Sequence, residues 1–145
     1  MATQTTYSDE QPVAVRGAIG TMLPAALISR TVEDAAGIGF GVAVEQGVGD
    51  NGCKVFDGGT VLGITVLDRS ATGVDEFAQY ESARVMVKGH IWVPAATGAQ
   101  AGDLVYVRPS NGDFQDVNTN SGVQIANARW ETSAGAGELA LIRLG

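Results

Sequence analysis

The sequence predicts an all-β fold, either a small β-barrel or a jelly-roll-like sandwich, with an extended N-terminal arm. Short apolar segments alternate with turn-forming residues about every ten positions, the spacing typical of sandwiches and barrels. The chain also contains 20 glycines, which favour tight turns between strands. No long stretch has apolar residues at helical spacing.

The longest strand is expected at residues 82–94, with the sequence Ser-Ala-Arg-Val-Met-Val-Lys-Gly-His-Ile-Trp-Val-Pro. Its odd positions, from Ala83 to Val93, are apolar or Gly, whereas the even positions mix charged and large amphipathic residues. Alternate side chains of a strand point to opposite faces, so this pattern predicts one core face and one face for water or a partner. Gly89 predicts a bulge or bend, and Pro94 ends the strand.

The other strands are expected at 39–44, 53–56, 61–67, 104–108, 114–117, 123–130 and 139–144. Residues 61–67 are almost all apolar, which indicates a strand buried on both faces. Residues 23–36 are ambiguous: Pro24 and Gly37 fit the two ends of a helix, but residues 28–32 are mostly β-branched or polar, and we interpret the segment as a strand. We assign 22–145 to a single β-domain.

Residues 1–21 form the predicted arm, which is polar and then rich in Gly and Ala. Two interpretations stay open. The arm is either a disordered terminus or a segment that becomes ordered only against a neighbouring subunit.

Composition excludes several classes of protein. Nine basic and sixteen acidic residues give a net charge of −7, which argues against nucleic-acid binding because that function normally needs a basic patch. The apolar stretch Met22 to Ile28 is too short to span a bilayer, and the first residues do not resemble a signal peptide, so we expect a soluble protein without membrane contact. The single cysteine, Cys53, excludes a disulfide within the monomer.

No group of residues predicts catalysis. His90 is the only histidine, so a metal site with several imidazoles is impossible. Cys53 precedes Lys54 but has no second cysteine or nearby histidine to activate it. The glycines of residues 37–41 lack the rest of a dinucleotide-binding motif. We therefore expect a protein that is not an enzyme and that binds neither cofactor nor metal.

Aromatic and arginine side chains near turns and on the outer strand face point instead to a protein interface. Each of these residues could also pack in the core. As a set, the candidate interface residues are Tyr7, Phe77, Tyr80, Arg84, Trp92, Arg129 and Trp130.

The order and spacing of these β-segments resemble those of the head cement, or capsid decoration, proteins of tailed bacteriophages. The resemblance covers roughly residues 25–145, and its sharpest part is Ala-Gly-Asp-Leu-Val-Tyr-Val at 101–107. The other matching segments are 28–33, 37–44, 61–68, 88–93 and 128–144.

The resemblance implies a virion protein, made in the host cytoplasm, that sits on the outer surface of the capsid. It implies the major capsid protein and further copies of the same chain, as a homodimer or homotrimer, as partners. Two alternatives remain: a small β-barrel enzyme or ligand-binding domain with a pocket between its sheets, for which a deep polar pocket around His90 would be evidence, and a tail or baseplate β-module.

Overall fold

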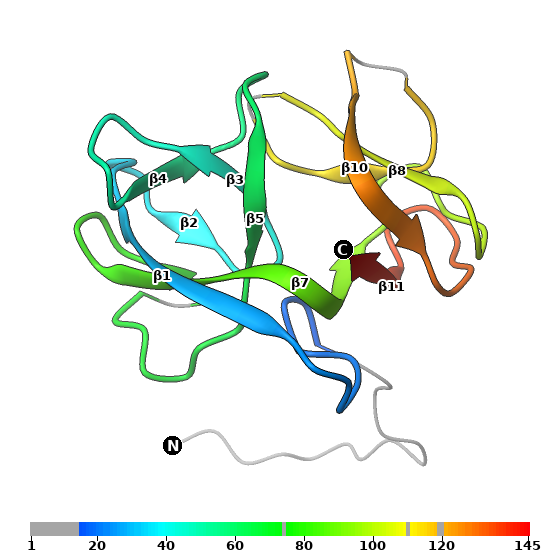
Figure 1. Ribbon diagram of the computed structural model, residues 1–145, viewed down its shortest axis with the longest axis horizontal. Helices are drawn as coiled ribbons and strands as arrows, with labels where there is room; N and C mark the ends of the chain where they lie inside the picture. Colours follow the sequence, from blue (N-terminus) through cyan, green and yellow to red (C-terminus); the bar gives the residue numbers. More distant parts are fainter. Residues whose placement is uncertain (1–14, 74, 110, 119–120) are drawn as a thin grey trace, which may run out of the picture.

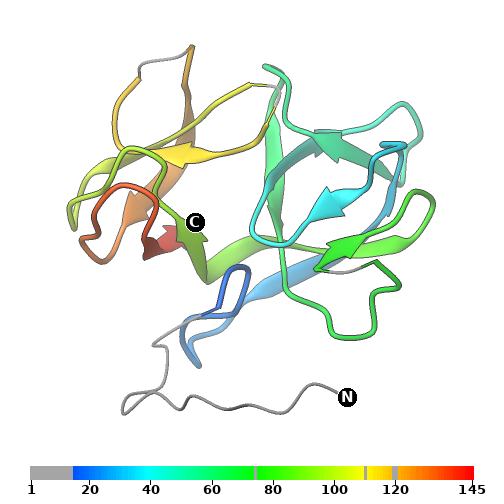
Figure 2. The same cartoon turned by 180° about the vertical axis from the view of Figure 1, so that it is seen from behind.

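The computed structural model describes residues 15–73, 75–109, 111–118 and 121–145, and the regular structure of these residues is entirely β (Figure 1 and Figure 2). Within these ranges no helix is long and apolar enough to cross a membrane. The strands are β1 (Ala26–Val32), β2 (Ile38–Gly39), β3 (Ala43–Gln46), β4 (Gly52–Val55), β5 (Val61–Thr65), β6 (Glu76–Phe77), β7 (Ser82–Pro94), β8 (Leu104–Val107), β9 (Phe114–Gln115), β10 (Val123–Trp130) and β11 (Leu139–Leu144).

The first half of the fold is a closed ring of strands in the order β1-β4-β3-β5-β7. β1 pairs in parallel with β4 at Thr31 and Val32, and it pairs antiparallel with β7 from Ala26 to Thr31. β5 completes the ring by pairing Ile64 and Thr65 with β7. Since this sheet returns to its own first strand, the ring is a small barrel, and the prediction of an all-β, barrel-like fold is confirmed.

β7 is shared between the two halves of the fold. Its first part pairs with β1 and β5, whereas residues 89–94 pair with β11. Gly89, at the change of partner, has φ = +133°, and the β1–β7 register shifts between Ala26 and Leu27. The bend predicted at Gly89 is therefore confirmed, and it allows one strand to run from the first sheet into the second.

The second half of the fold continues from β7 through β11, β10 and β8 to β9. A parallel bridge from Ala95 to Phe114 then brings β9 back beside the end of β7. In Figure 1 this half carries the yellow to red strands, beside the cyan and green strands of the first ring.

Two clusters of buried apolar side chains fill the fold. One comes from the first half only, and its members are Val32, Ile38, Phe40, Val42, Val44, Cys53, Phe77, Ala83 and Val85. The other combines residues of β3, β5 and β7, such as Ile64 and Met86, with Trp130 and Ile142 of the second half. The two halves are therefore packed on one another through a common core.

The two-residue pattern of β7 holds on both sides of its bend but fails at the bend itself. Ala83, Val85, Ile91 and Val93 are buried as the sequence predicts. Met86, an even position, is also buried, because the second cluster covers its face of β7 at this point.

Most predicted strands are present, and one is interrupted. The ambiguous segment 23–36 contains strand β1, as interpreted from its β-branched residues. The prediction of one continuous strand at 39–44 is wrong, because a turn with Gly41 at φ = +68° separates β2 from β3. Thr65 holds this turn: its carbonyl oxygen accepts from the Gly41 N–H (2.8 Å), and its hydroxyl oxygen accepts from the Val42 N–H (3.0 Å).

Part of the predicted arm lies against β7 of the same chain. The Gly17 N–H donates to the Trp92 carbonyl oxygen (2.8 Å), and the Trp92 N–H donates to the Ala18 carbonyl oxygen (3.0 Å). The Gly20 N–H also donates to the His90 carbonyl oxygen (2.9 Å). Residues 16–21 thus occupy a β7 edge in the described structure, and Tyr7 lies outside the described residues.

Candidate functional site

Four exposed apolar side chains lie in the nine-residue stretch 15–23, which precedes β1, and we call them the apolar strip. Val15 is 47% exposed, Ile19 42%, Met22 104% and Leu23 59%. They make up half of the eight large apolar side chains that are exposed in the described residues. Grouped apolar side chains on a surface mark contact sites for other molecules, whereas single ones are ordinary.

The backbone beneath the strip is fixed by close contacts. A Cβ atom on Gly20 would overlap the end of the Leu141 side chain, so a larger residue here would require that side chain to move. Beside it, Thr21 Oγ1 lies 3.1 Å from Nδ1 of His90, in hydrogen-bonding contact. An apolar surface that is already ordered loses less conformational entropy when a partner binds.

A basic hollow adjoins the strip. Lys88, Arg129 and Arg143 line a hollow of about 510 Å³ together with Asn127 and Gly145. A smaller hollow of about 270 Å³, lined by Leu23 and Leu144 among others, shares Lys88 and Arg143 with it.

The positive charge of this hollow is only partly balanced. The one ion pair of its arginines among the described residues joins Arg143 to Glu131, at 3.2 Å on the surface. Such exposed pairs stabilise by at most about 1 kcal/mol. In a chain of net charge −7, the hollow is therefore a local basic site suited to acidic groups of a partner.

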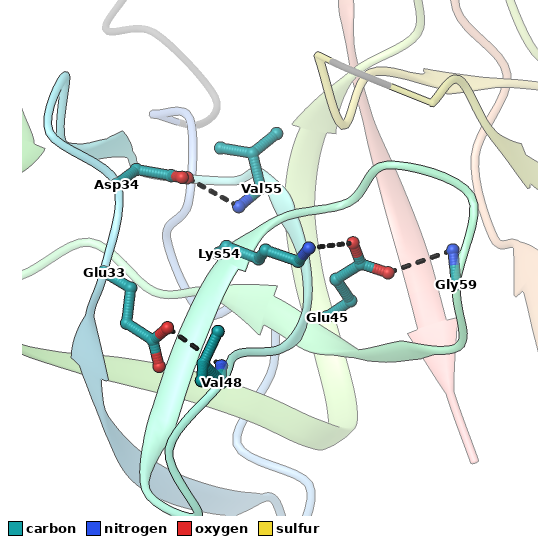
Figure 3. Close-up of polar contacts among 7 residues, drawn as sticks. All are labelled: Glu33, Asp34, Glu45, Val48, Lys54, Val55 and Gly59. Carbon is teal, nitrogen blue, oxygen red and sulfur yellow. Dashed lines mark hydrogen bonds and ion pairs between the residues drawn. The ribbon is translucent and has the colours of Figure 1, made fainter.

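In the first ring, the carboxylates of Glu33 and Glu45 hold the loops after β3 and β4 in place (Figure 3). Glu33 accepts from the N–H groups of Val48 (2.9 Å) and Gly49 (3.2 Å). The two oxygens of Glu45 bond to the Gly59 N–H (2.9 Å) and pair with Lys54 Nζ (3.5 Å).

A hollow of about 570 Å³ lies beside Asp34 and Lys54. Asp34 accepts from the Val55 N–H at 2.8 Å, and Lys54 is paired with Glu45. The polar groups of this hollow therefore bond to their own chain, and they support the hairpin between β3 and β4.

Cys53 and His90 are placed as structural residues. Burial raises the pKa of the Cys53 thiol to about 11, and the nearby carboxylates of Asp34 and Glu33 act in the same direction. His90 is half-buried and contacts the Thr21 hydroxyl. Among the described residues, no group of three or more His, Cys, Asp and Glu side chains could hold a metal ion.

The predicted interface residues are divided between surface and core. Trp92 is half-buried beneath Gly20 of the strip segment, and Arg129 is exposed at the basic hollow. Tyr80 is 76% exposed in the loop before β7. Arg84 is half-buried on β7.

The prediction of an interface position is wrong for two residues, which are buried in the core. Phe77 is fully buried and packs edge-to-face on Phe40, with ring centroids 5.1 Å apart. Trp130 is 1% exposed and belongs to the cluster shared by the two halves. Both rings are in the core because each lies at a strand position that faces inward, which a single aromatic residue in a sequence does not reveal.

The prediction omitted Ile19, Met22, Leu23, Lys88 and Arg143, which the structure places at the candidate surface. A signal was present for the strip. Residues 22–26 read Met-Leu-Pro-Ala-Ala without a polar residue, although the strand that begins at Ala26 is mostly half-buried or exposed.

Comparisons with known proteins agree with this fold. The capsid of Myoviridae phage XM1 contains a chain that is similar over 100% of this chain and 98% of its own length, with a TM-score of 0.79 and 15% sequence identity. The head fiber gp8.5 N base of bacteriophage phi29 is more distant, with a TM-score of 0.44, 12% identity and coverage of 84% of this chain and 95% of its own. No curated protein matches by sequence.

The family comparison identifies the protein class. A family described as "Structural cement protein (E217 gp24/Pam3 gp6)" matches residues 3–145, nearly the whole sequence. The sequence-based identification as a capsid cement protein of the virion is therefore confirmed. The chain belongs to the family of phage structural cement proteins.

Proposed function

We propose that this chain attaches to the outer surface of an assembled phage head and strengthens the contacts between neighbouring major capsid proteins. The match of residues 3–145 to the structural cement family is the observation that carries this proposal. In this proposal the chain only adheres to the capsid and catalyses no reaction. The bonded His90 and the buried Cys53 support that part of the proposal.

The apolar strip is the part of the surface that meets the capsid protein. Met22 is fully exposed and Ile19 partly exposed, on a backbone already held by β7. Burial of a side chain of this size contributes about 1.5–3 kcal/mol at most. One contact of this kind is weak, and retention on the shell then depends on several copies or several contacts acting together.

The test is binding of the purified chain to undecorated heads, measured by co-sedimentation over a range of concentrations. The variant Ile19→Ser/Met22→Ser replaces two members of the strip that do not line the basic hollow. We expect its half-saturating concentration to rise at least about tenfold, which corresponds to 1.4 kcal/mol. The matched control is Val117→Ser, an apolar residue that is 41% exposed between β9 and β10.

Thermal unfolding of each variant checks that the barrel is intact. The proposal predicts wild-type binding for Val117→Ser and weakened binding for the strip variant at an unchanged melting temperature. If the wild-type chain fails to sediment with heads, attachment to the shell is wrong. If only the control loses binding, the strip is not the contact surface.

A further inference from the structure

Three positive side chains from three neighbouring strands meet at the basic hollow. Lys88 comes from β7, Arg143 from β11 and Arg129 from β10, and all three line the same hollow of about 510 Å³. These strands lie side by side in the order β7-β11-β10 (Figure 1). The hollow is therefore built across a sheet and does not belong to a single loop.

The register of this sheet places like charges opposite one another. Arg129 pairs with Arg143 across β10 and β11, and Arg143 pairs with His90 across β11 and β7. Lys88 lies two residues before His90, so it is a diagonal neighbour of Arg143 on the same face. Like charges directly opposite each other destabilise a sheet. The carboxylate of Glu131 balances only part of this charge, through its ion pair with Arg143 at 3.2 Å.

An irregularity in β10 adds a neutral polar group to the same hollow. The register between β10 and β8 shifts between Gln124 and Arg129, which marks a bulge. Within the bulge Asn127 has φ = +61°, and Asn127 lines the hollow together with Arg129. Bulges re-aim the side chains that follow them. The Asn127 amide can therefore donate to a ligand that the arginines hold.

The donors of the hollow favour a phosphate over a carboxylate. An arginine binds either group through two parallel N–H donors, so one arginine satisfies both oxygens of a planar carboxylate. A phosphate is tetrahedral and carries a charge of about −1.5 to −2 at pH 7, so its oxygens can reach donors from several strands at once. The net charge of −7 on the chain repels long polyanions, which favours a small free anion as the ligand.

We propose that the basic hollow binds a small free phosphate-class anion, held between Arg129 and Arg143 with Lys88 and Asn127 beside them. The bound anion offsets the repulsion between the two opposed arginines, and it thereby stabilises the sheet of the second half. The inference goes beyond capsid attachment, because the ligand is a small anion and the residues that hold it lie outside the apolar strip.

Two-dimensional NMR of the ¹⁵N-labelled chain, titrated with inorganic phosphate against chloride at constant ionic strength, locates the site. We expect a dissociation constant on the order of 1–5 mM. The shifted resonances should centre on Lys88, Arg129 and Arg143. Succinate, a dicarboxylate of similar charge, should bind at least about tenfold more weakly than phosphate.

Thermal unfolding in about 50 mM phosphate and in chloride of equal ionic strength measures the effect on stability. Phosphate also stabilises proteins in general, because it is excluded from their surfaces. The variant Arg129→Gln separates the two effects: its phosphate-dependent rise in melting temperature should be smaller than that of the wild-type chain by about 3 °C or more. In chloride the variant should melt no lower than the wild type, because one of the two opposed arginines is gone.

Arg69→Gln is the matched control, since Arg69 is exposed in the loop after β5 and lies outside the hollow. Its phosphate-dependent rise should equal that of the wild-type chain. The proposal is wrong if phosphate shifts no resonance of the hollow up to about 50 mM, if succinate binds as tightly as phosphate, or if Arg129→Gln keeps the full rise. A lower melting temperature of Arg129→Gln in chloride would also contradict it. All of these measurements use the free chain, so their outcome is independent of head binding.

Discussion

Gly89→Ala tests whether the change of partner along β7 depends on glycine. Gly89 has φ = +133°, and a Cβ there would lie 2.9 Å from Ala25 Cβ and 3.2 Å from Met86 Sδ. The backbone conformation costs a non-glycine residue about 1–3 kcal/mol. The crowding adds about 1–3 kcal/mol, as in other overpacked sites. Together the two effects should lower the free energy of unfolding by about 2–6 kcal/mol, a large share of the total for a domain of this size.

Gly102→Ala is the matched control for this experiment. Gly102 has φ = +93°, but its Cβ would meet no atom within 4 Å, so this variant carries the backbone cost without the crowding. Denaturant unfolding followed by tryptophan fluorescence measures both variants. If Gly89→Ala and Gly102→Ala differ by less than about 0.5 kcal/mol, then the approach of Ala25 and Met86 does not constrain the bend, and the reasoning is wrong.

Three further predictions concern the core, the loop before β7 and the cysteine. Trp130→Ala should lower the free energy of unfolding by about 3–5 kcal/mol, measured by denaturant unfolding, since the ring is buried; a change below about 1 kcal/mol would contradict its place in the core. The N–H groups of Ala78 and then Thr72 lower the pKa of Glu81 from its usual 4.5. The stabilisation by Glu81 is therefore present above pH 4.5 and lost as the pH falls through the lowered folded-state pKa. Glu81→Gln should flatten this part of a pH series of unfolding curves, and an unchanged slope would contradict the assignment. Cys53 should resist a thiol reagent at pH 8 until the chain unfolds, because its pKa is about 11 and it is buried; rapid labelling of the folded chain would contradict this.

The strands were predictable where local chemistry sets both their ends. β7, β10 and β11 have the bounds that turn residues and alternating apolar residues predict. The segment 39–44 was not, because its interruption depends on Thr65, which is distant in sequence and bonds to the turn at Gly41. The sharing of β7 between two sheets is likewise a tertiary feature, and Gly89 showed only that a bend was needed.

The candidate surface was only partly predictable, since exposure depends on which face of each strand meets the core. Trp92 is half-buried and Arg129 is exposed, but Phe77 and Trp130 were assigned outward although both are buried. Aromatic residues were favoured as interface residues, and these rings were therefore chosen over Met22. The Met22 side chain is exposed, in a segment that lies along an edge of β7. Lys88 and Arg143 come together only through the pairing of β7 with β11.

The most direct test of the account is an electron cryo-microscopy map of heads decorated with the wild-type chain. We predict density for this barrel on the outside of the shell, with residues 15–23 turned toward the major capsid protein and Met22 covered by it. A map in which Met22 faces solvent while another surface of the barrel meets the shell would contradict the account, as would density located on the tail.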